Sequence, residues 1–437
     1  MDKIQKTINL IFDGNIFANE LEKNSNRSGI FFVAYNLIKE FSQKENINIT
    51  LYYNYKNYHK LKLLLETNKL PDKCKLLPKN KKFNHISKIQ IGFCGTLNQI
   101  LQFAANSQQD NLLKKALRFF VYRIFRYNQL TNIDLLTDND IYFSACDKIP
   151  EKILNNPRIK SYQILHDVIP IIMEKEYKGF NSPLLWMQEL IDSLRAQNKY
   201  FTVSEHTKKD VLKCAPWMLE ENFIVTYLGA NDNFKPEGNQ NKIREIKTKY
   251  NIPQDKKYVF SLCTLEPRKN IIFAVKNFLS FIKDNGINDL VIALGGASWK
   301  KFIQVLEEEF DNLQEYKEYI IKLGYVDDED LNILYSGAEL FVYPSLYEGF
   351  GLPILEAMQC GCPVICSNTT SMPEVIGNAG MQINPNSEKE LIEAYKKLYY
   401  DTDYKQTCVK LGLERAKQFS WEKCANIMVE QFMKDLS

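Results

Sequence analysis

The sequence lacks a long apolar run at its start. It reads Met-Asp-Lys-Ile-Gln-Lys before a strand-like stretch from Thr7 to Phe12, which is too short for a signal peptide or a membrane-spanning helix. Ten cysteines are present but no Cys-x-x-Cys pair, and Cys360, Cys362 and Cys366 do not have the spacing of a tetrahedral zinc site. We therefore expect a cytoplasmic protein with reduced cysteines.

The chain also lacks a large net charge, which is only +3. The charge is nevertheless uneven, because residues 1–200 carry 29 Lys and Arg against 19 Asp and Glu, while residues 201–437 carry 27 against 34. A basic half can attract nucleic acid or an anionic membrane surface, and a solvated Lys-rich surface explains it equally well. No nucleic-acid-binding module is recognisable, so we expect no nucleic-acid partner.

Length and patterning predict two α/β domains. A chain of 437 residues exceeds the size at which single cores stop growing. Short apolar runs alternate with helical patterns, which favours doubly wound parallel sheets. The predicted strands are 8–13, 49–53, 141–143, 161–165, 199–203, 258–262, 289–294, 319–323, 340–343 and 363–366.

A polar stretch at residues 231–241 is the best linker candidate. It places the predicted domains at residues 1–235 and 236–419, followed by a last helix within 420–437 that Ser420 caps. A further segment, residues 112–127, combines basic and aromatic residues at a helical period. It predicts either a helix on an anionic bilayer or a core helix with a basic solvent face.

The most informative stretch runs from Tyr343 to Ala357. A strand ends, two glycines release the backbone, and a helix begins near Leu352. The amides of Gly349, Phe350, Gly351 and Leu352, with the positive end of the helix dipole, would suit a diphosphate. Carboxylates lie on both sides of this turn, at Glu348 and Glu356, and carboxylates accept hydrogen bonds from sugar and ribose hydroxyls.

This Glu-x7-Glu pattern resembles the signature of the retaining GT-B glycosyltransferases, and bacterial mannosyltransferases of surface-polysaccharide assembly look most similar. The resemblance implies two Rossmann-like domains facing across a cleft, with the last helix crossing back to the N-terminal domain. It implies that Glu356 binds the donor ribose. It also implies that Glu348 lies near the transferred sugar, as a nucleophile or as an electrostatic stabiliser.

Further segments resemble the same family. Arg268 and Lys269, after the predicted strand at 258–262, match its pair of cations for the diphosphate, and such cations can stabilise a departing phosphate without a metal. His166 matches a histidine that faces the donor sugar or leaving phosphate, and Tyr325 matches a segment beside the nucleobase. Ser204 is expected mainly as a helix cap.

The family's N-terminal loop normally carries a pair of glycines, reduced here to Gly29 alone. The resemblance is faint in this acceptor-binding half of the chain, so the acceptor is less well specified than the donor.

The resemblance implies a metal-independent retaining hexosyltransferase that needs no cofactor. GDP-mannose is the first choice of donor, and the acceptor is a glycan or a lipid-linked saccharide, reached through peripheral contact of the basic N-terminal half with the inner membrane. Four alternatives stay open: a UDP-sugar or deoxysugar donor, a sugar-phosphate synthase, an inverting GT-B enzyme such as an epimerase, and an inactive nucleotide-sugar-binding partner of an assembly complex.

Overall fold

The computed structural model describes residues 6–21, 29–54, 57–78, 136–137, 140–175, 181–262, 266–296 and 316–437. Segment 112–127, considered above for membrane contact, lies outside these residues. Within the described part of the chain, every helix falls short of the length and apolar character that a membrane span requires.

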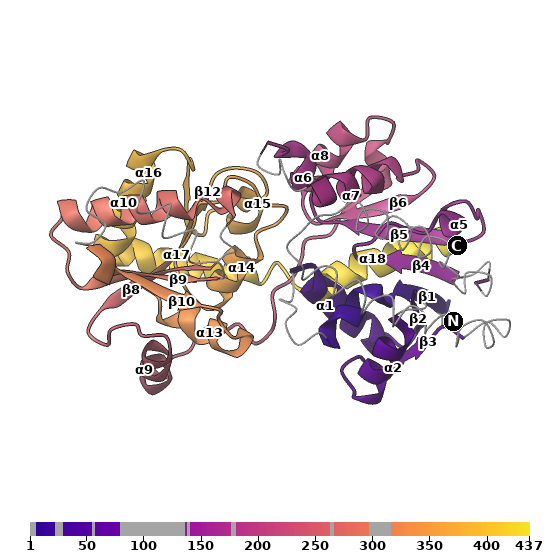
Figure 1. Ribbon diagram of the computed structural model, residues 1–437, viewed down its shortest axis with the longest axis horizontal. Coiled ribbons are helices and arrows are strands. Elements are labelled where there is room, and N and C mark those ends of the chain that lie inside the picture. Colours follow the sequence, from indigo (N-terminus) through magenta and orange to yellow (C-terminus); the bar gives the residue numbers. More distant parts are fainter. Residues whose placement is uncertain are drawn as a thin grey trace, which may run out of the picture. The chain divides into compact units, whose positions relative to one another are not determined.

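The described strands form two sheets (Figure 1). The first sheet has the order β3-β2-β1-β4-β5-β6-β7 and the second has the order β10-β9-β8-β11-β12-β13. The strand pairs with a defined register run parallel, for example β1 with β2 and β8 with β9. Strands that are neighbours in space but not in sequence need crossover connections, as in doubly wound α/β folds. The predicted α/β fold class is confirmed.

The strands of the first sheet are β1 Ile8–Asp13, β2 Ile47–Tyr52, β3 Cys74–Leu76, β4 Asp140–Ser144, β5 Lys160–Leu165, β6 Lys199–Thr202 and β7 Phe223–Val225. Those of the second are β8 Lys257–Leu262, β9 Leu290–Gly295, β10 Ile320–Gly324, β11 Leu340–Tyr343, β12 Val364–Ser367 and β13 Met381–Ile383. The predicted strands match their counterparts to within about two residues. The sequence did not reveal β3, β7 and β13, which have three residues each.

The α-helices are α1 Gly29–Gln43, α2 Tyr58–Glu66, α5 Glu151–Leu154, α6 Ile169–Ile172, α7 Asn181–Asp192, α8 Glu205–Cys214, α9 Gln240–Lys249, α10 Ile271–Asp284, α13 Asp328–Gly337, α14 Leu352–Gln359, α15 Met372–Ile376, α16 Glu388–Tyr400, α17 Thr402–Ala416 and α18 Trp421–Leu436. The 3-10 helices are η1 Gly14–Leu21, η4 Glu220–Asn222, η5 Pro267–Lys269 and η6 Lys317–Tyr319.

The chain divides into two compact units, Met1–Gln163 with Glu430–Ser437, and Ile164–Val429. The end of α18 therefore belongs to the first unit. There, the Phe432 ring lies 4.7 Å from Tyr162 and 6.1 Å from Phe143, and the Tyr162 hydroxyl donates to Asp435. These contacts confirm that the last helix returns to the first sheet. The predicted boundary near residue 235 stays a prediction.

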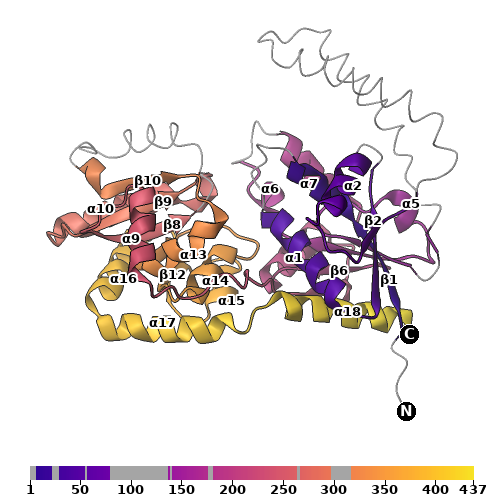
Figure 2. The same ribbon diagram turned by 90° about the horizontal axis from the view of Figure 1, so that it is seen from below.

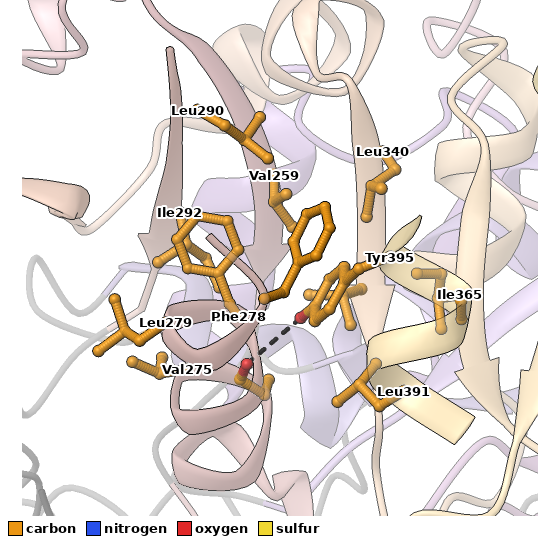
Figure 3. Close-up of a cluster of buried hydrophobic side chains, with 14 of the residues drawn as sticks. Val259, Val275, Phe278, Leu279, Leu290, Ile292, Leu340, Ile365, Leu391 and Tyr395 are labelled. Atoms are coloured by element: carbon orange, nitrogen blue, oxygen red, sulfur yellow. Dashed lines mark hydrogen bonds between the residues drawn. The ribbon is translucent and has the colours of Figure 1, made fainter. Parts of the chain in front are cut away.

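The second unit contains a large apolar core between the second sheet and its helices (Figure 3). Strand β9 is buried along its whole length, as expected for a parallel sheet with both faces covered. Phe278 of α10 is fully buried, and the Tyr395 hydroxyl of α16 donates to the carbonyl of Ala274 at 3.3 Å. Helix α17 packs on α14 and α16 (Figure 2). This core fixes the strand ends from which the site loops emerge.

Candidate active site

The loop after β11 carries the first glutamate of the predicted pair. It ends at Gly351, which has φ +107°. This is a left-handed backbone conformation that residues other than glycine rarely adopt. Helix α14 begins at the next residue, Leu352, and Pro353 occupies its first turn, where a missing N–H costs nothing. Gly351 is one of the two glycines that the sequence predicted to release the backbone at this turn.

Glu348 is buried, and both oxygens of its carboxylate are hydrogen bonded. Oε1 accepts from Lys269 Nζ at 2.6 Å and from the Tyr343 hydroxyl at 2.9 Å, while Oε2 accepts from Arg268 Nη1 at 2.9 Å. Burial alone would raise the pKa of this carboxyl, but Lys269 and Arg268 more than offset it and hold the pKa below its ordinary value. Glu348 is therefore ionised at neutral pH.

The two cations lie on η5, directly beside this loop. The backbone N–H of Leu346 donates to the carbonyl of Arg268 at 2.7 Å. Asn270, which has φ +55°, donates through its side chain to the carbonyls of Pro344 and Pro385. Both segments are thus joined by main-chain and side-chain bonds, which keep the guanidinium and ammonium groups next to Glu348.

The end of β5 also meets this loop. A Cβ added to Gly349 would lie 2.2 Å from the carbonyl oxygen of His166, so only glycine fits there. Thr207 Oγ1 donates to the carbonyl of His166 at 3.2 Å and to the carbonyl of Gly349 at 3.0 Å. Ser204 Oγ also donates to the Gly349 carbonyl, at 2.7 Å. Ser204 also caps α8 by accepting from the Thr207 amide, as its predicted role requires.

Asp167 completes this charged group. Burial raises the pKa of its carboxyl and the charge of Glu348 adds to that effect, whereas the Ile169 amide, Arg268 and His166 lower it. The side chains of Asp167, Arg268 and Glu348 therefore influence one another electrostatically, although the chain brings them from different strand ends. Such clustering of perturbed groups is typical of functional sites.

The second glutamate of the pair lies inside α14. Glu356 Oε2 accepts from the buried Tyr335 hydroxyl at 3.0 Å. Burial raises the pKa of Glu356 to about 7, with a smaller contribution from Asp328, and the Tyr335 hydroxyl opposes the shift. Near neutral pH this carboxyl therefore exists in both protonation states, unlike Glu348.

Comparison with known proteins assigns the chain to a family. Residues 242–415 match the model described as "Glycosyl transferases group 1". The O-antigen chain mannosyltransferase B of Escherichia coli is 32% identical to this chain, over 61% of the chain and 68% of that protein. The chain belongs to the group 1 glycosyltransferases. The serotype-specific mannosyltransferase WbdA of Escherichia coli is 28% identical over 63% of this chain, which spans only 33% of that longer protein.

Solved structures agree with this glycosyltransferase in fold. HepE from Anabaena, in complex with UDP and glucose, has a TM-score of 0.63 at 14% identity, covering 98% of this chain and 100% of that one. WaaG, a glycosyltransferase involved in lipopolysaccharide biosynthesis, has a TM-score of 0.60 at 12% identity, covering 98% and 99%. These likenesses confirm the predicted GT-B architecture.

The structure also describes three other predicted site residues of the glycosyltransferase, Phe350, Tyr325 and Gly29. Phe350 is buried among aromatic rings, 6.0 Å from Phe419, so only its backbone is available for the predicted amide contact. Tyr325 is 62% exposed, after Gly324 at φ +71°. Gly29 is the exposed first residue of α1, in the first unit. The roles given to these residues stay predictions.

The structure adds residues that the sequence did not point out. Thr370, at φ +56°, accepts from the Glu348 amide through its hydroxyl at 3.2 Å. Ser371 donates to the carbonyls of Glu348 and Phe350, both at 2.9 Å. A polar Ser-Asn-Thr-Thr-Ser run after an apolar strand was the available signal, because in parallel sheets such strand ends share one edge with the other site loops.

The glycosyltransferase contains three Asp-x-Asp sequences, a pattern that can hold a metal, at 138–140, 328–330 and 401–403. Asp330 is paired with Lys249, and Asp401 is paired with Lys397 and accepts from the Tyr404 amide. Among the described residues, no group of three or more His, Cys, Asp or Glu side chains is arranged to hold a metal ion.

Proposed function

We propose that this glycosyltransferase moves a hexose, mannose first, from a nucleotide diphosphate sugar to a hydroxyl of a glycan or lipid-linked saccharide, with retention at the anomeric carbon and without a metal ion. One observation carries the proposal. The buried, ionised carboxylate of Glu348 is held between Arg268 and Lys269, and its loop packs on the strand end that carries His166.

On the donor side, the diphosphate binds Arg268, Lys269 and the amides of residues 349–352 at the start of α14. A departing nucleoside diphosphate gains negative charge as the glycosidic bond breaks, and fixed cations stabilise that charge without reorganisation. The guanidinium offers paired donors to phosphate oxygens, and the ammonium acts as a compact charge. Glu356 accepts the ribose hydroxyls in its ionised form, and His166 contacts the donor sugar or the leaving phosphate.

In the transfer step, the bond between the anomeric carbon and the phosphate oxygen breaks while the acceptor hydroxyl approaches from the same face. The acceptor oxygen forms the new glycosidic bond, and its proton passes to the leaving phosphate oxygen. The anomeric carbon becomes electron-poor between these events. An ionised carboxylate nearby stabilises it, and the lowered pKa of Glu348 keeps that carboxylate ionised.

The choice of mannose rests on the names of relatives, among them the O-antigen chain mannosyltransferases of Escherichia coli and Salmonella typhimurium. Their names also support an acceptor in surface-polysaccharide biosynthesis. HepE was solved with UDP-glucose, which keeps a UDP-sugar donor as the alternative. A lipid-linked acceptor at the cytoplasmic membrane face suits the basic first 200 residues.

The test is a panel of nucleotide sugars offered to the purified protein, with nucleoside diphosphate release and saccharide product both measured. We expect turnover with GDP-mannose above all other donors, loss of turnover in Glu348→Gln, and an α-anomer from an α-donor by NMR. A β-product would indicate an inverting enzyme. Nucleotide binding without hydrolysis or transfer for any donor would favour the inactive binding partner instead.

A further inference from the structure

A second polar cluster lies next to the Glu348 group and has no part in the proposed chemistry. It consists of His206, Asp210 and Tyr347. His206 Nε2 lies 3.0 Å from Asp210 Oδ2 and 3.2 Å from the Tyr347 hydroxyl, which itself donates to Asp210 Oδ2. The rings of His206 and Tyr347 meet edge to face with centroids 5.6 Å apart.

Asp210 is the acceptor at the centre of this cluster. It is buried, and its Oδ1 accepts from the exposed Lys213 at 2.9 Å. Burial would raise the pKa of Asp210, but hydrogen bonds from His206 and Lys213 outweigh it and lower the pKa. An ionised carboxylate only accepts hydrogen bonds. His206 must therefore donate through Nε2, so the cluster requires a hydrogen on that nitrogen.

Tyr347 connects this cluster to the Glu348 group. Its carbonyl accepts from Arg268 Nη1 at 3.2 Å, and the same nitrogen donates to Glu348 Oε2 at 2.9 Å. The hydroxyl of Tyr347 is thus bound to α8, while its backbone is bound to the proposed phosphate-binding cation. Tyr347 therefore links α8 to Arg268 and, through Arg268, to Glu348.

Helix α8 holds the residues on both sides of Glu348. Tyr347 is bound by His206 and Asp210, and the carbonyl of Gly349 accepts from Ser204 and Thr207. The start of α8 is itself fixed, because the Glu374 carboxylate accepts from the amides of Glu205 and His206, both at 2.8 Å. The first turns of α8 therefore form a rigid support for this short loop.

We propose that His206 and Asp210 are positioning residues, which act through Tyr347 to set the orientation of Glu348 and Arg268 for transfer. This inference rests on the proposed function, since it gives Glu348 and Arg268 their tasks at the donor. It assigns His206 to the loop and not to the substrate.

The test compares Tyr347→Phe, His206→Phe and His206→Gln with a control, Tyr399→Phe, whose hydroxyl likewise donates to an aspartate, Asp289, at 2.6 Å. Because displacements near 1 Å cost up to about 100-fold in rate, we expect kcat/KM to fall about 10-fold in Tyr347→Phe and His206→Phe. His206→Gln keeps a donor and should recover most of the rate. Tyr399→Phe should match the unchanged protein.

Two results separate this inference from the proposed function. If the protein is active and its Tyr347→Phe and His206→Phe variants keep full kcat/KM, the positioning role alone is overturned. The same holds if the loss of kcat/KM equals the fraction of unfolded protein measured by circular dichroism. A protein inactive with every donor overturns the proposed function and the role together. The chain has 4 histidines, so ¹⁵N NMR at a pH where the rings are neutral can identify the tautomer of His206. An Nδ1–H tautomer would contradict the hydrogen bonds of this cluster, whatever the activity.

Discussion

Replacing Gly349 by alanine tests how tightly the Glu348 loop fits against the end of β5. The new Cβ would lie 2.2 Å from the His166 carbonyl oxygen and 2.9 Å from Asp167 Cβ. Ordinary contact begins at 3.4 Å, so the loop or the strand end must move by the difference, about 1.2 Å. The nearest atom is backbone and cannot rotate away, so one of these two segments has to shift as a whole.

The cost of this shift can be worked out in two parts. Overpacking a tight contact destabilises by about 1–3 kcal/mol. The hydrogen bonds from Ser204 and Thr207 to the Gly349 carbonyl are weakened as well, at about 1 kcal/mol each. We therefore expect the free energy of unfolding to fall by about 3–5 kcal/mol. Since Glu348 moves with the loop, turnover should fall by about 100-fold.

The assay is turnover of the preferred nucleotide sugar at saturation, with thermal unfolding of the same samples. Gly238→Ala is the matched control, because a Cβ there meets no atom within 4 Å, and it should keep both values. If Gly349→Ala unfolds at the temperature of the unchanged protein and retains its turnover, then the close approach of His166 to this loop is not a feature of the working enzyme.

Four further predictions follow from the same contacts. Glu356→Ala should weaken nucleotide binding measured by calorimetry, and unchanged affinity would refute its ribose role. Because burial raises the pKa of Glu356 to about 7, nucleotide affinity should rise as pH increases through 7, and Glu356→Gln should remove that dependence. The raised pKa also means that this carboxyl lowers the folding stability as the pH rises from the ordinary pKa of a glutamate toward 7. EDTA should leave turnover unchanged if Arg268 and Lys269 stabilise the leaving group, whereas loss of activity restored by Mn²⁺ would exclude that assignment. Phe278→Ala should cost about 3–5 kcal/mol in chemical denaturation because the ring is fully buried, and a loss below about 1 kcal/mol would contradict its place in the core.

Patterns short enough to lie within one segment could be predicted from the sequence. The apolar runs that became β8, β9 and β11 are buried along most of their length, so their composition alone identified them. The glycine turn before α14 could be predicted because two glycines follow the apolar run, and Gly351 does adopt a positive φ in the structure. Three-residue strands such as β13 are too short to show an alternation of apolar and polar residues. Whether such a segment forms a strand depends on its pairing with a neighbouring strand.

Contacts between distant segments could not be predicted in this way. Arg268 and Glu348 are 80 residues apart, and Tyr347 and Asp210 are 137 apart. Their pairing depends on which strand ends share an edge, and polar residues in loops carry no periodicity that would reveal it. The family resemblance supplied Arg268, Lys269 and Glu348 as a set, but it gave no reason to notice His206 or Asp210.

The contacts of Glu348 suggest how its two cations divide their work. Lys269 is buried, and its ammonium and the Tyr343 hydroxyl both donate to Glu348 Oε1. These two hydrogen bonds do not involve Oε2, the oxygen that Arg268 binds. Arg268 binds Oε2, and its Nε is paired with Glu266, whose side chain is 40% exposed. Exposed pairs contribute little, so a diphosphate competes more easily for the guanidinium than for the ammonium. A diphosphate that takes Arg268 removes one stabilising charge from Glu348 and leaves Lys269 to keep it ionised. In the proposed function both cations bind the diphosphate, and Lys269 has the additional task of keeping the carboxylate of Glu348 ionised.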